Sequence, residues 1–187
     1  MKIKKTIIVL LLCFLPVAPS FAQKVGEALS AWKEGYMDIH HINTGCGECA
    51  YIIFPDGTTM LVDAGENKAD NPRHVLPKPN AGRTPGEWIV DYIQAMAPDQ
   101  NQKLDYALIT HFHSDHMGGV FKTKNESGRY YNTGIITVAE NIRINKLVDR
   151  GFPDYKFLVN TEDKMIKNYF NFLHFTKRRI HVEQFRP

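Results

Sequence analysis

The stretch HFHSDHMGG, residues 111–119, places three histidines and one aspartate within six positions. The apolar segment LDYALIT, residues 104–110, leads directly into it and predicts a strand buried on both faces. Such a strand would fix the point at which the following loop begins. His111 and His113, two positions apart, can then turn toward one metal ion, and Asp115 and His116 toward a second. The two glycines that follow allow the backbone to fold tightly behind these side chains.

Imidazole nitrogen and carboxylate oxygen are common ligands of zinc. The main alternative is a structural zinc site, but such sites usually form closed ligand sets that include cysteines. Side-chain packing rarely gathers so many of these residue types in so short a stretch. The motif therefore predicts a metal site, and it favours catalysis, in which zinc keeps a position open for water.

The rest of the chain supplies few further donors. His174 falls in a predicted helix and His181 in a predicted strand, and both are expected to be packing or surface histidines. Three later carboxylates lack any ligand context: Asp149, Asp154 and Asp163. We therefore expect the remaining ligands to lie outside this chain, as in the N-terminal part of a larger hydrolase.

The N-terminus has the features of a secretory signal peptide at residues 1–22. Three lysines precede an apolar run, Thr6 to Leu15, and Ser20-Phe21-Ala22 fits a signal peptidase site. The run is shorter than the roughly 20 residues that a membrane-spanning helix needs. The alternative is an uncleaved anchor, but the pattern favours export and a mature chain that begins at Gln23.

Length and charge limit the classes of function. One domain, residues 23–187, is expected at this length. The whole chain carries a net charge of +3, but residues 1–22 contain three lysines and no acid. The mature chain therefore has no net charge, and charge gives no indication of nucleic-acid binding. Neither a membrane segment after cleavage nor an oligomeric state is indicated.

Cys46 and Cys49 are spaced as C-G-E-C. A disulfide is compatible with export, and half of a zinc site or a redox motif is the alternative. The pattern favours small residues in a tight turn.

Apolar periodicity and turn signals predict the other elements. A helix is expected from Thr84, which can form a capping box with Glu87, up to Pro98. The remaining expectations are strands at 37–43, 50–54, 60–65, 142–149 and 180–185, a hairpin turn at 55–58, long loops at 66–83 and 122–134, and a helix at 161–178.

THFHSDHMGG, residues 110–119, resembles the signature of the metallo-β-lactamase-fold hydrolases. LVDAG, residues 61–65, is similar to a strand-end Asp-x-Gly motif of that family. Residues 42–65 further resemble the opening of the hydrolase domain attached to bacterial competence DNA-uptake proteins. That branch typically reads Gly-Gln-Gly-Asp, where this chain has Gly-Cys-Gly-Glu at 45–48.

The resemblance implies an α+β fold, the four-layer αββα sandwich of two similar halves, of which this chain holds mainly the N-terminal half. The domain at 23–187 would then be incomplete at its C-terminus. The resemblance also implies that Asp63 supports the metal loop without touching the metal, as outer carboxylates orient ligand histidines. An intact homologue would bind two zinc ions.

The function that this implies is a secreted, periplasmic or extracellular, zinc-dependent hydrolase. Metal-activated hydroxide would attack an ester, amide or phosphodiester in a small-molecule or phosphodiester substrate, with Asp115 orienting the nucleophile. The alternative is a truncated, non-catalytic metal-binding remnant, or an interaction module with the same fold. Whether this chain alone is an enzyme depends on ligands that it does not plainly supply.

Overall fold

The computed structural model describes residues 26–45, 47–66, 75–76, 78–98, 102–155, 160–176 and 180–184. The chain divides into two units, Met1–Ser30 and Ala31–Pro187, and all the elements described below belong to the second. The predicted signal peptide, Cys46 and part of the predicted loop at 66–83 lie outside the described residues.

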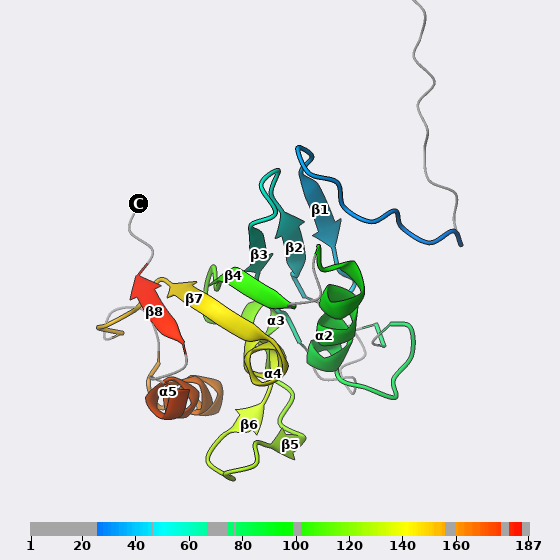
Figure 1. Cartoon of the computed structure of the whole chain (residues 1–187). Coiled ribbons are helices and arrows are strands. Elements are labelled where there is room, and N and C mark those ends of the chain that lie inside the picture. Colours follow the sequence, from blue (N-terminus) through cyan, green and yellow to red (C-terminus); the bar gives the residue numbers. More distant parts are fainter. Residues whose placement is uncertain are drawn as a thin grey trace, which may run out of the picture. The chain divides into compact units, whose positions relative to one another are not determined.

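A six-stranded mixed sheet forms the centre of the second unit (Figure 1). Its order is β1 (Asp38–His41), β2 (Ala50–Ile53), β3 (Thr59–Val62), β4 (Lys103–Leu108), β7 (Arg143–Asp149) and β8 (His181–Gln184). β1, β2 and β3 pair antiparallel, whereas β3, β4, β7 and β8 run parallel. The carboxyl ends of β3, β4 and β7 therefore meet at one edge of the sheet, where segments far apart in sequence come together.

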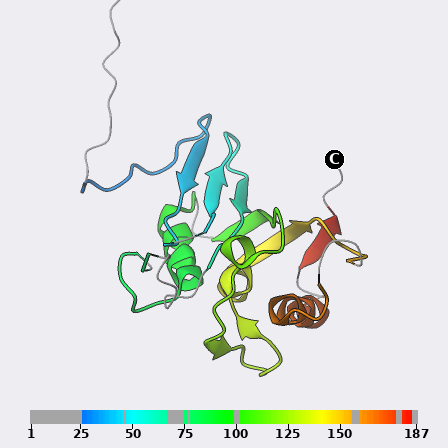
Figure 2. The same cartoon turned by 180° about the vertical axis from the view of Figure 1, so that it is seen from behind.

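Four helices and a small hairpin complete the described fold. The helices are α2 (Pro85–Met96), α3 (Ser114–Met117), α4 (Gly134–Asn141) and α5 (Lys164–Thr176), and β5 (Thr123–Lys124) pairs with β6 (Tyr131–Asn132). α2, α4 and α5 share one hydrophobic core with the sheet, and Figure 2 shows the same arrangement from behind. None of the helices in the described part of the chain is both long and apolar enough to span a bilayer.

Most of the predicted elements are present, with ends shifted by a few residues. The start of α2 is confirmed in detail, because Glu87 N–H donates to Thr84 Oγ1 (3.3 Å) and Thr84 N–H donates to Glu87 Oε2 (2.7 Å). The predicted loop at 122–134 instead contains the short β5–β6 hairpin.

The prediction that the strand before the metal motif is buried on both faces was wrong. Leu104 and Ala107 of β4 are fully buried, but Tyr106 is 38% exposed. The buried strand residues belong to the core shared with the helices, and the alternate residues of β2 and β3 are only partly buried. The described part of the chain thus covers one face of the sheet well and the other poorly.

The helix α4 was not expected from the sequence. Its sequence, GIITVAEN, contains four β-branched residues and a leading glycine, which are poor helix formers. Five of its residues are buried, among them Ile135, Ile136 and Val138. Tertiary packing therefore stabilises a helix that local propensity does not favour.

Candidate metal site

The metal loop, residues 111–116, begins where β4 ends at the carboxyl edge of the sheet. The backbone pairing continues past β4, since Ile109 N–H donates to the carbonyl of Val148 at 2.9 Å. α3 then turns the chain at once, with His113 as its N-cap residue. The parallel neighbours of β4 therefore determine where the loop starts.

Three of the predicted ligands converge within this loop. One donor atom each from His111, His113 and Asp115 can be chosen so that all lie within 4.8 Å of one another. The ring centroids of His111 and His113 are 4.7 Å apart, and His113 is exposed to solvent. The two imidazoles therefore lie side by side.

This donor set fits a divalent metal ion such as zinc. Two donors of a tetrahedral zinc ion with bonds of about 2.1 Å lie roughly 3.4 Å apart, so small side-chain rotations would bring these atoms to that separation. Burial, followed by the charges of His116 and His113, lowers the pKa of His111. A lowered pKa favours the neutral imidazole, which is the form that binds metal.

The structure places the His116 ring between His111 and Asp63. His116 Nδ1 lies 2.8 Å from Asp63 Oδ2, and its ring centroid is 3.7 Å from that of His111. The other ring nitrogen, Nε2, lies 3.8 Å from Asp115 Oδ2. One side of the ring therefore faces the buried carboxylate, and the other faces the exposed side of the loop.

Asp63 directly follows β3 and reaches the metal loop through hydrogen bonds. Its backbone has φ = 59°, a left-handed conformation that is uncommon outside glycine. Its carboxylate accepts hydrogen bonds from the Thr110 N–H (2.8 Å) and the Thr110 hydroxyl (2.7 Å). The position of Asp63 is compatible with the supporting role that the family resemblance implies, and that role remains a prediction.

Backbone hydrogen bonds and close packing hold the metal loop against residues 48 and 65. Glu48 N–H donates to the carbonyl of Asp115 at 2.8 Å, and Gly65 N–H donates to the carbonyl of Glu48 at 2.9 Å. A Cβ atom at Gly65 would collide with the Asp115 carbonyl, so only glycine fits there. Glu48 and the Asp-x-Gly segment at 63–65 are thus parts of the same support.

Glu66, which no sequence motif singled out, is a fully buried carboxylate behind the loop. Its side chain accepts hydrogen bonds from the backbone N–H groups of Gly86 (3.3 Å), Val120 (3.1 Å) and Gly134 (3.1 Å). Its own N–H donates to the carbonyl of Ser114 at 2.9 Å. Burial raises the pKa of Glu66, and the three backbone donors oppose that rise. The residue joins the starts of α2 and α4 to the metal loop, a role that local spacing does not reveal.

Asp149, which was considered as a donor, has another role. Its buried carboxylate accepts hydrogen bonds from the hydroxyls of Tyr155 and Tyr169 and from two backbone N–H groups, all at 2.8 Å. Burial, together with the charge of Asp149, raises the pKa of both tyrosines. Both tyrosine rings lie within 6 Å of the ring of Phe112, the buried residue of the metal loop. Asp149 therefore supports the loop through aromatic packing.

The other candidates do not join the cluster. His174 is exposed in α5, and His181 is exposed in β8 with Nε2 3.0 Å from Glu183 Oε1. Asp163 accepts a hydrogen bond from Met165 N–H at the start of α5. Cys49 is buried and has no disulfide partner among the described residues, and burial raises the pKa of its thiol. Its candidate partner, Cys46, lies outside those residues.

Residues 43–128 match the family model of the metallo-beta-lactamase superfamily. This match supports the superfamily. The matched range runs from the turn before β2 through the metal loop, and the mixed α/β structure with its multi-stranded sheet is consistent with the α+β fold of the superfamily. The family match and the His-His-Asp cluster together indicate a metal-binding hydrolase fold. No curated protein matches the chain.

Proposed function

We propose that this chain is an exported, zinc-dependent hydrolase of the metallo-β-lactamase fold that cleaves an ester, amide or phosphodiester. The observation that carries the proposal is the convergence of His111, His113 and Asp115 at the carboxyl edge of the sheet. Two imidazoles and a carboxylate form the kind of donor set that holds a catalytic zinc ion. Zinc bound there would supply a Lewis acid and make a water molecule more acidic.

The chain's own residues would bind the ion, orient its ligands and contact the substrate. His111, His113 and Asp115 would hold the ion. His116 would contribute Nε2, and Asp63 would hold the orientation of the His116 ring. The side chain of Asp115 is 48% exposed, so its second carboxylate oxygen can accept a hydrogen bond from a water molecule or substrate at the mouth of the site. Glu66 and Asp149 would keep the loop in position without touching the substrate.

The proposal is tested by zinc titration and by hydrolysis assays with His113→Ala. We expect zinc binding by calorimetry and zinc-dependent cleavage of a generic phosphodiester, aryl ester or β-lactam, both lost in the variant. His181→Ala is the matched control, because this exposed histidine lies outside the cluster. Equal zinc binding by the wild-type protein and His113→Ala would refute the metal site.

A second candidate is a metal-binding protein without catalysis, as in the N-terminal part of a larger hydrolase. The observation that favours it is that the only donor cluster in the described residues has three members. Fewer protein ligands would weaken the affinity and leave the ion poorly fixed. Zinc binding that depends on His113 but gives no turnover with any of the three substrate classes would support this candidate.

Export is tested by the mass of the protein recovered from the medium or periplasm. We expect an N-terminus at Gln23. A protein that retains Met1 in the cytoplasm would contradict the proposed localisation.

A further inference from the structure

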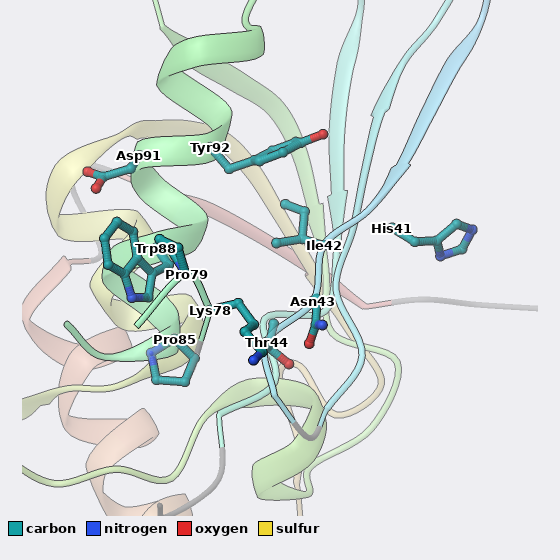
Figure 3. Close-up of a pocket in the computed structure, with 10 residues that line it drawn as sticks. All are labelled: His41, Ile42, Asn43, Thr44, Lys78, Pro79, Pro85, Trp88, Asp91 and Tyr92. Atoms are coloured by element: carbon teal, nitrogen blue, oxygen red, sulfur yellow. The ribbon is translucent and has the colours of Figure 1, made fainter. Parts of the chain in front are cut away.

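A pocket of about 430 Å³ lies between α2, the end of β1 with the loop that follows it, and residues 78–79 (Figure 3). Pockets of a few hundred Å³ with mainly apolar walls are typical of small-molecule sites. The apolar side chains that line it are Ile42, Pro79, Pro85, Trp88 and Tyr92.

Hydrogen bonds hold the two aromatic walls of the pocket in place. The indole N–H of Trp88 donates to the carbonyl of Asn80 at 3.0 Å, and the Arg83 guanidinium lies 5.4 Å from the Trp88 ring centroid. The Tyr92 hydroxyl lies 3.0 Å from His40 Nδ1. Walls that are already fixed lose little conformational entropy when a ligand binds.

The charged groups at the pocket favour an anion. Asp91 is already paired with Arg83 at 2.7 Å. Lys78 also lines the pocket, and it forms no ion pair with any residue that the structure describes (Figure 3). A ligand with a flat apolar body and an acidic substituent would therefore satisfy both the walls and the lysine.

One wall of the pocket is joined to the metal loop through the turn after β1. The Thr44 hydroxyl donates to the carbonyl of Gly47 at 3.0 Å, and the next residue, Glu48, donates its N–H to the carbonyl of Asp115. The other wall, the start of α2, is joined to the loop through Glu66, which accepts from Gly86 N–H and donates to the carbonyl of Ser114. Both walls are therefore connected by hydrogen bonds to the segments that hold the proposed metal ligands.

We propose that this pocket binds the part of the substrate that is not cleaved, a planar apolar group bearing a carboxylate or similar anion. The substrates would then be esters or amides of aryl type with an acidic group. This inference rests on the proposed function, but the pocket itself needs no metal to bind such a group.

The first test is calorimetric titration of metal-free protein with 2-naphthoate. We expect saturable one-to-one binding, weakened about tenfold in Lys78→Gln, as the loss of one favourable charge contact of about 1.4 kcal/mol implies. Lys122→Gln, at an exposed lysine outside the pocket, should bind as the wild type does. The neutral 2-acetylnaphthalene should bind the wild type as weakly as naphthoate binds Lys78→Gln.

Trp88→Leu removes the flat wall and should abolish naphthoate binding, with thermal unfolding used to confirm that the variant is folded. The pocket assignment is overturned if metal-free protein shows no saturable binding, or if neither Lys78→Gln nor Trp88→Leu changes it. Hydrolysis separates the two proposals. Naphthoate binding without any zinc-dependent cleavage would refute the proposed function and leave the pocket as a binding site, whereas cleavage without naphthoate binding would refute the pocket alone.

Discussion

Asp63 shows how one residue connects the sheet to the metal loop. Its left-handed backbone turns the carboxylate toward Thr110 and His116, which lie 47 and 53 positions away. Sparsely populated backbone conformations persist where the surrounding structure holds them, and they cluster at functional sites. The orientation of His116 therefore depends on a strand end far away in sequence.

Asp63→Ala should weaken zinc binding by about 10- to 100-fold, the usual loss when a carboxylate that orients a ligand histidine is removed. Asp63→Asn should bind zinc at an intermediate level, because asparagine tolerates the left-handed backbone but carries no charge. Calorimetric titration measures both affinities. Asp56→Ala, in the exposed hairpin turn, is the control. Unchanged affinity in Asp63→Ala would show that His116 does not depend on this contact.

Glu66 should matter for stability as well as for the site. Glu66→Ala would leave three buried backbone N–H groups without an acceptor, and each such loss costs about 1–3 kcal/mol. We expect a lower free energy of unfolding in urea and faster hydrogen exchange in residues 112–120, measured on metal-free protein. Glu126→Ala, at an exposed glutamate, should change neither. An unchanged exchange rate at 112–120 would show that Glu66 does not hold the loop.

At the scale of elements, His40 joins β1 to α2, since its Nδ1 lies 3.0 Å from the Tyr92 hydroxyl. Burial lowers the pKa of His40 below its usual 6.5, and the charge of Asp38 partly opposes this. The Nε2 atom of His40 is buried and has no hydrogen-bond partner among the described residues. The folded protein therefore favours the neutral ring more than the unfolded chain does.

The sign of the pH effect follows from this shift. Since the unfolded state binds the proton more readily, the contribution of His40 to stability is fully present above pH 6.5 and is lost as the pH falls below that value. His40→Gln should therefore flatten the dependence of the free energy of unfolding on pH between 7 and 5. Denaturant unfolding at several pH values measures this, with His181→Gln as the exposed control. An equal slope in His40→Gln and the wild type would contradict the assignment.

On the scale of the whole molecule, an apolar row crosses four strands on the poorly covered face of the sheet. Ile39, Ile52, Met60 and Tyr106 are successive cross-strand partners, and Ile39 and Tyr106 are 51% and 38% exposed. Neighbours in such a row point to the same side of the sheet. Contiguous exposed apolar surface of this kind favours association.

We therefore expect the protein to self-associate with increasing concentration, as analytical ultracentrifugation can measure. Ile39→Lys and Tyr106→Lys together should shift the protein toward the monomer, because like charges on two such faces repel. Thr123→Lys, on the exposed β5 strand, adds a lysine elsewhere and should leave association unchanged. A wild-type protein that stays monomeric at high concentration would refute this prediction.

The local pattern of the sequence was sufficient to predict the cluster of His111, His113 and Asp115, the strand before it and the start of α2. The predicted ligands lie within six positions, and the capping box spans four, so neither depends on distant contacts. The sheet's strands were also predictable, since alternation of apolar residues is a local signal. The family match over residues 43–128 is consistent with that local information.

Only the tertiary structure revealed the contacts of Glu66 and Asp149 that hold the loop in place. Glu66 acts on residues some 50 positions away, and Asp149 acts through two tyrosines and Phe112, whereas the supporting role of Asp63 was already implied by the family resemblance. α4 is helical because its apolar side chains are buried, although its β-branched residues favour strands. Tyr106 remains exposed because the described helices cover one face of the sheet. Each of these features depends on contacts between segments that are distant in sequence. The spacing of residues along the chain does not determine those contacts.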